Sequence, residues 1–86
     1  MPDIWDRLWA CLADSHVRDV VYVYRIGVDG RPITPYLLRS HATEELPEIL
    51  RDQYGGGKFQ ILIRRGKKML LSGRIAIGLP ISKRYT

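Results

Sequence analysis

The sequence is poor in residues that form disulfides or bind metals. Its 86 residues include one cysteine, Cys11, and two histidines, His16 and His41. A single cysteine excludes an internal disulfide, and a closed tetrahedral zinc site would need a carboxylate beside these three ligands, at an unusual spacing. We therefore expect no metal and no other cofactor. Because so small a core gives limited stability, the protein could gain further stability by forming a homo-oligomer.

Long apolar runs are also missing. No run approaches the ~18 apolar residues of a transmembrane helix, so no transmembrane segment is expected. The opening stretch, MPDIWDRLWACLADSH, has neither the basic leader nor the apolar centre of a signal peptide. The expected location is the cytoplasm of the cell that produces the protein.

Known catalytic patterns are absent as well. The chain has no Gly-x-Ser-x-Gly or His-Glu-x-x-His motif, and Cys11 and His16 lie across a predicted helix end, where they need not face each other. The run Gly55–Lys58, GGGK, lacks the hydroxyl residue of a phosphate-binding loop and lies where a helix is predicted to end, at the negative pole of its dipole. These glycines are best interpreted as a helix end and a turn into a strand. We expect no catalytic residue and no enzyme.

Acidic residues are missing from the last third of the chain. Residues 53–86 contain eight lysines and arginines and no carboxylate, which gives this segment a charge of +8. Residues 1–52 contain six arginines and nine carboxylates, a charge of −3. Such a division creates a field of one sign that attracts nucleic acid, another polyanion or an acidic protein surface.

The hydrophobic pattern predicts six elements. Apolar spacing predicts an amphipathic helix over residues 4–13, with Asp3 as its N-cap, and a second helix over 46–55. Alternation predicts strands over 20–26, 58–65 and 69–79. The turn chemistry of Asp29 and Gly30 predicts that 33–39 is the returning strand of a hairpin, short or at a sheet edge because Pro32 and Pro35 have no amide hydrogen. This order predicts an α+β fold, with helices on one face of a four-stranded antiparallel sheet. Residues 1–86 would form one domain: an N-terminal amphipathic helix within 1–16, a ββαββ core over 17–80 and a basic tail over 81–86.

The basic residues concentrate around the last predicted turn, RRGKK. A two-stranded ribbon fits a nucleic-acid groove, and lysine and arginine bind phosphates. The other interpretation is that charges at a turn only maintain solubility and protect a sheet edge. The candidate contacts to nucleic acid or another polyanion are Lys58, Arg64, Arg65, Lys67, Lys68 and Arg74.

A set of short motifs between Val20 and Ile77 resembles a module of small phage and mobile-element proteins. The motifs are VYVYRI, PYLL, LPEIL, YGGGKFQILIR and LLSGRIAI: a hairpin, a Leu-Pro helix, an aromatic-Gly-Gly-Gly-basic-aromatic turn and a final hairpin. The resemblance implies a viral or mobile-element origin and a non-enzymatic role. The location would then be the host cytoplasm or a virion.

The two tryptophans support an alternative function. Trp5 and Trp9 lie on one face of the predicted first helix, where they either cover the core or form a partner-binding surface, since tryptophan is enriched at interface hot spots. In the second case the protein would be a virion structural or assembly component or an inhibitor of a host protein, acting through this helix or a sheet edge. A third hypothesis is capture of a small anionic nucleotide between protomers.

Overall fold

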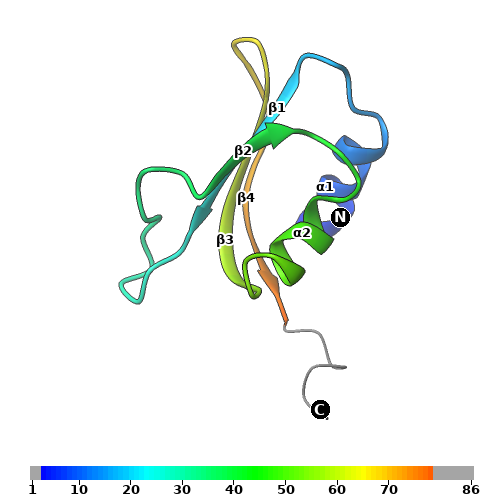
Figure 1. The fold of residues 1–86 in the computed structure, drawn as a ribbon. Helices are drawn as coiled ribbons and strands as arrows, with labels where there is room; N and C mark the ends of the chain where they lie inside the picture. Colours follow the sequence, from blue (N-terminus) through cyan, green and yellow to red (C-terminus); the bar gives the residue numbers. More distant parts are fainter. Residues whose placement is uncertain (1–2, 79–86) are drawn as a thin grey trace.

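The computed structural model describes residues 3–78, which form two layers (Figure 1). One layer is a four-stranded antiparallel sheet, and the other consists of two helices that cover one of its faces. The predicted α+β fold is confirmed. The predicted basic tail, 81–86, lies outside the described residues. The elements are α1 (Ile4–Ala13), β1 (Asp19–Arg25), β2 (Leu38–His41), α2 (Leu46–Asp52), β3 (Gly57–Arg65) and β4 (Lys68–Ile77).

Helix α1 has the predicted bounds and the predicted cap. The Asp3 side chain accepts a hydrogen bond of 2.9 Å from the Asp6 amide, which satisfies one of the free donors of the first turn. Leu8 and Leu12 are buried against the sheet, whereas the Trp9 side chain is 44% exposed. The apolar stripe of this helix therefore serves mainly the core.

The sheet has the strand order β2-β1-β3-β4, so β1 and β3 are central. Every second side chain of these strands faces the helices and is buried there, as the alternating sequence predicted. The core combines these side chains with the inner positions of both helices. Its largest contributors are Val21, Val23, Phe59, Ile61, Ile63, Leu71, Leu8, Leu46 and Leu50.

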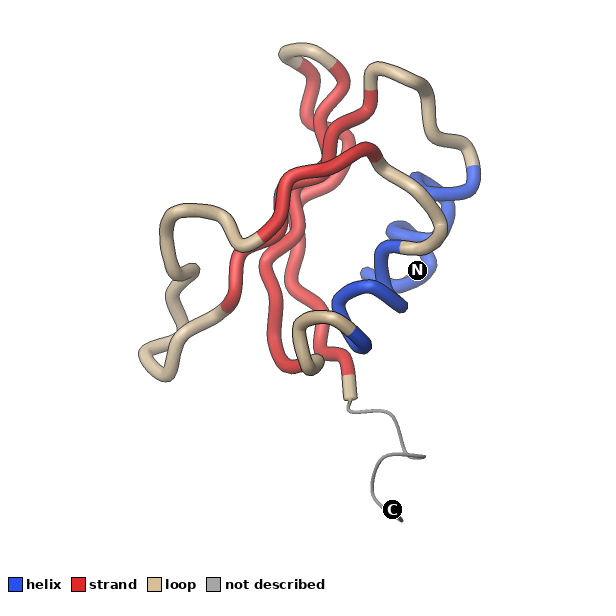
Figure 2. Tube along the Cα trace, in the orientation of Figure 1, coloured by secondary structure: helices blue, strands red, loops and turns tan. Residues whose placement is uncertain are grey.

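The predicted second strand, 33–39, was placed too early, because β2 covers only Leu38–His41. Pro32 and Pro35 have no amide hydrogen to donate to a strand ladder. The chain makes one isolated bridge, Ile26 to Pro32, and then an irregular connection before pairing resumes at Leu38. This connection projects from the sheet on the side opposite the helices (Figure 2). The expectation of a short edge strand is confirmed.

The glycine run closes α2, as expected from the sequence. Gly55, Gly56 and Gly57 all have positive φ, and the Gly56 amide donates to the Leu50 carbonyl at 3.0 Å. The exposed carbonyls of this turn are then satisfied by Arg25 of β1, which donates to Tyr54 O at 2.7 Å and to Gly56 O at 3.0 Å. The helix end thus binds a cation of the protein itself, consistent with its negative pole.

Gly73 of β4 allows α1 to approach the sheet closely. A Cβ atom built at this position would overlap the side chain of Ile4, at the start of the helix. The backbone of Gly73 has no left-handed φ, so the requirement is space and not conformation. The glycine thus leaves room for the Ile4 side chain against β4.

An ion pair between a buried carboxylate and a partly exposed arginine joins the ends of β1 and β3. Asp19 is 1% exposed and accepts two hydrogen bonds from Arg65, from Nε at 2.6 Å and from Nη2 at 3.0 Å. The His16 amide donates a third at 2.9 Å. The Arg65 hydrogen bonds lower the pKa of Asp19 to about 2, although burial alone would raise it.

Gly73→Ala should destabilise the fold by about 1–3 kcal/mol, because the added methyl group overpacks the contact with Ile4. Combining it with Ile4→Val should cost less than the sum of the two single changes, since the second substitution removes the overlapping methyl group. Urea unfolding measures these free energies. Gly78→Ala, which meets no atom within 4 Å, is the control and should be neutral. Strict additivity would contradict the assigned contact.

The Asp19–Arg65 pair should make stability depend on acid pH. The folded-state pKa of Asp19 lies below its ordinary value of 3.8, so the contribution is complete above about pH 4 and is lost as the pH falls towards 2. Arg65 is 40% exposed at its side chain, so water screens the pair and reduces this contribution. Urea unfolding at several pH values should therefore show that the unmodified protein is more stable than Asp19→Asn above about pH 4. This difference should shrink as the pH falls towards 2. Arg65→Met should remove the same pH-dependent component, and a constant difference would refute the assignment.

Candidate functional site

The sheet face turned away from the helices carries a distinct set of side chains, and we call it the open face. Residues paired across antiparallel strands share a face, so the cross-strand pairs Val20–Arg64, Tyr22–Leu62 and Tyr22–Arg39 all lie here. The pair Gln60–Arg74 extends the face to β4. Its members are Val20, Tyr22, Tyr24, Arg39, His41, Lys58, Gln60, Leu62, Arg64, Met69, Ser72, Arg74 and Ala76.

Three tyrosines form a cluster on the open face. Tyr36, from the connection between β1 and β2, contacts Tyr22 with ring centroids 5.4 Å apart and Tyr24 at 6.3 Å. Both contacts are edge-on, at 71° and 89°. Tyr36 is 44% exposed, and the other two rings are half-buried. The cluster therefore presents aromatic surface to solvent.

Beside the cluster, three arginines surround a hollow of about 340 Å³, which we call the arginine hollow. Arg39 comes from β2, Arg64 from β3 and Arg18 from the segment before β1, and Tyr22 lines the hollow with them. Arg39 lies over the Tyr22 ring at 5.6 Å, and its Nε donates to the Tyr22 hydroxyl at 3.2 Å. Within residues 3–78, none of the three pairs with a carboxylate.

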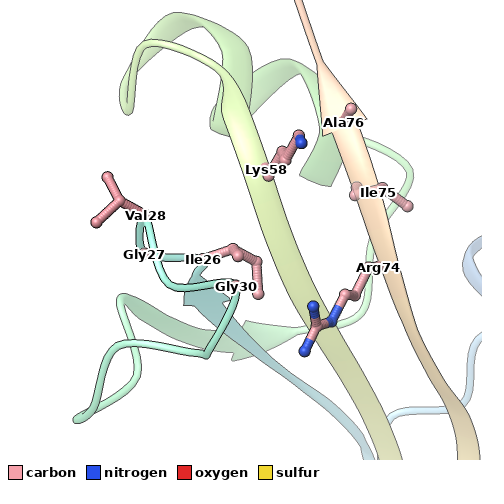
Figure 3. A pocket seen from close by; sticks show the side chains of 8 residues that line it. All are labelled: Ile26, Gly27, Val28, Gly30, Lys58, Arg74, Ile75 and Ala76. Carbon is pink, nitrogen blue, oxygen red and sulfur yellow. The ribbon is translucent and has the colours of Figure 1, made fainter.

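A second basic hollow, of about 370 Å³, lies towards the other end of β3 (Figure 3). Lys58 of β3 and Arg74 of β4 line it opposite the turn that contains Gly27 and Gly30. The Arg74 side chain reaches across β3, where its Nε donates to the Gln60 Oε1 at 3.1 Å. Gln60 in turn donates to the Gly73 carbonyl at 3.0 Å, so it fixes the guanidinium in place. We call this the lysine-arginine hollow.

The carboxylates lie elsewhere. Asp19 is buried on the helical side of the sheet, and Asp29 lies in the turn after β1, where it accepts from the Arg31 amide. The other seven of the nine carboxylates belong to the helices and the segments that flank them, and none is on the open face. They are Asp3, Asp6, Asp14, Glu44, Glu45, Glu48 and Asp52. The molecule thus has an acidic helical layer and a basic open face.

The structure divides the residues predicted as polyanion contacts. Lys58, Arg64 and Arg74 lie on the open face. Arg65 faces the helical side and is held by Asp19, so its charge is already neutralised. Lys68 is paired with Arg65 and shares its side, and Lys67 lies in the turn. The RRGKK motif is therefore not one continuous patch.

Sequence reasoning missed the other members of this surface. Arg18 and Arg39 are far from Arg64 in the chain, and strand pairing brings them to the same hollow. Tyr36 joins the surface through its contacts with Tyr22 and Tyr24. A signal did exist for Tyr22, because it alternates with the buried valines of β1 and therefore belongs to the opposite face.

The two tryptophans line a separate hollow of about 560 Å³ between α1, α2 and the end of β4. Trp5 is half-buried and packs against the core, whereas Trp9 is exposed. Glu44, Glu48 and Arg51 also line this hollow, which makes its rim mostly acidic. It lies on the helical side of the sheet.

The described residues contain no grouping typical of a metal centre, since no three histidine, cysteine or carboxylate side chains in 3–78 come together. Neither helix of this region is long and apolar enough to cross a membrane. Cys11 is a half-buried free thiol, and the His16 Nδ1 accepts a hydrogen bond from the Arg18 amide. Comparisons with protein-family models, with curated proteins and with solved structures found no match to this chain.

Proposed function

We propose that the protein is a non-enzymatic binding module that contacts nucleic acid through its open face. The observation that carries the proposal is the arrangement of charge. Five cations gather at two hollows of one sheet face, and none of the nine aspartate and glutamate side chains lies at a strand position of that face, although Asp29 belongs to the turn beside the lysine-arginine hollow. The five are Arg18, Arg39, Lys58, Arg64 and Arg74.

Phosphates are the natural partners of such a surface. Lysine and arginine contacts to phosphate release condensed counterions, which gives affinity that falls steeply with salt. The guanidinium groups of the arginine hollow also offer paired donors suited to phosphate oxygens. The acidic helical layer would orient the molecule, because a polyanion is repelled from that side and attracted to the other.

Fluorescence anisotropy with labelled oligonucleotides tests the proposal, and it should show binding that weakens with salt. The double variant Arg39→Gln/Arg64→Gln removes two open-face charges. Its log-log salt slope should be reduced by about 1.4–1.8, because each lost phosphate contact contributes about 0.7–0.9.

Two variants with the same loss of charge are matched controls. Lys67→Gln/Lys68→Gln changes the turn after β3 and the first residue of β4, and Arg7→Gln/Arg51→Gln changes the helical layer. Both control variants should keep most of the salt dependence that the unmodified protein shows. If the turn variant loses as much as the open-face variant, the contact surface is the hairpin tip. Absence of binding at low salt would remove the proposal.

A second candidate function is a protein-protein contact at the tryptophan hollow, favoured by the exposure of Trp9 beside an acidic rim. The partner would present an apolar side chain next to a basic one. Trp9→Ala should keep the fold, because this side chain is 44% exposed and is not part of the buried core. Light scattering should then show that self-assembly is lost, or capture from host extract should show that a partner is no longer bound. If both assembly and capture are unchanged, this candidate is rejected.

A further inference from the structure

Resting on the proposed function, we infer that the open face binds single-stranded nucleic acid and stacks unpaired bases on its tyrosine cluster. The phosphates would be held by the arginine hollow and the lysine-arginine hollow, on either side of the stacked bases. Both DNA and RNA present this chemistry.

The width of the sheet favours a single strand over a duplex. Four strands span three inter-strand spacings of roughly 4.8 Å, or about 14 Å before side chains are added. The major groove is about 12 Å wide, so this face cannot enter it. The phosphates of a duplex would contact only the lysines and arginines of this face, and its paired bases could not reach the tyrosines. Only unpaired bases use both kinds of side chain.

The geometry of the cluster suits base stacking. Both contacts of Tyr36 are edge-on, so neither is a parallel stack in which one ring lies flat on another. An exposed aromatic face accepts a base regardless of its identity, because every base has a π-face. Tyr36 offers the largest exposed aromatic surface on this side of the sheet, so it is the principal stacking residue.

The order of groups along β3 gives the line along which the nucleic-acid strand would lie. Arg64 lies at one hollow and Lys58 at the other, six residues or about 20 Å apart. Tyr22 and Tyr24 lie opposite the β3 residues between them. A strand at the stacked rise of about 3.4 Å covers this distance with about six nucleotides. The minimal site is therefore about four to six nucleotides.

Anisotropy with four ligands of equal length tests the inference: single-stranded DNA, single-stranded RNA, duplex DNA and an abasic phosphodiester strand. The single strands should bind more tightly than the duplex and the abasic strand, with affinity levelling off at about four to six nucleotides. Tyr36→Leu should weaken single-strand binding by about 5- to 150-fold, the range for loss of one stacking ring, and should leave abasic binding unchanged. Tyr36→Phe keeps the ring and should keep the affinity.

The outcomes separate this inference from the proposed function. Equal binding of single, abasic and duplex ligands, with no effect of Tyr36→Leu, would overturn base stacking while leaving phosphate binding intact. Tighter binding of the duplex would also overturn it. Failure of every ligand to bind at low salt would remove the proposed function itself. A fall in abasic binding by Tyr36→Leu would show a general disturbance of the face and would reject the specific role of this ring.

Discussion

The antiparallel pairing of β1 with β3 is the constraint on which the rest of the structure depends. It runs from Asp19–Arg65 to Arg25–Phe59, and an arginine fixes each end. At one end Arg65 binds the buried Asp19 carboxylate; at the other, Arg25 binds the carbonyls that close α2 and lies over the Phe59 ring at 4.9 Å. A slip of one residue would turn every side chain to the wrong face and leave the Asp19 carboxylate buried without its partner.

Local features of the sequence were sufficient to predict the elements and the core. Helix α1, its Asp3 cap and the buried positions of β3 follow from side-chain period and capping chemistry, which act over a few residues. The second strand was misplaced because turn chemistry predicts residues 33–39 as the direct return of a hairpin, whereas Pro35 has no amide hydrogen for the ladder. Pairing between β1 and β3 joins residues 46 positions apart at the Asp19–Arg65 end, and nothing local encodes it.

The candidate site was predicted only in part for the same reason. The sequence located an excess of positive charge after residue 52, and three of the six proposed contacts do share a face. Alternation along the predicted strand 58–65 already implied that Arg64 and Arg65 point to opposite sides, but the prediction grouped them by their position in the chain. The sequence could not show that Arg18 and Arg39 join Arg64 across three segments. A charge division along the chain thus becomes a division between two layers.

The strand positions of the open face carry no aspartate or glutamate, and this is informative because these residues are plentiful elsewhere. A sheet face that only meets water gains from mixed charges, and opposite charges across strands stabilise it. Here three guanidinium groups surround one hollow, and none of them pairs with a carboxylate within residues 3–78, while seven carboxylates lie around the helices. Like charges held together destabilise the folded chain unless a partner neutralises them. A polyanion on this face would remove that repulsion, so binding and folding would support each other.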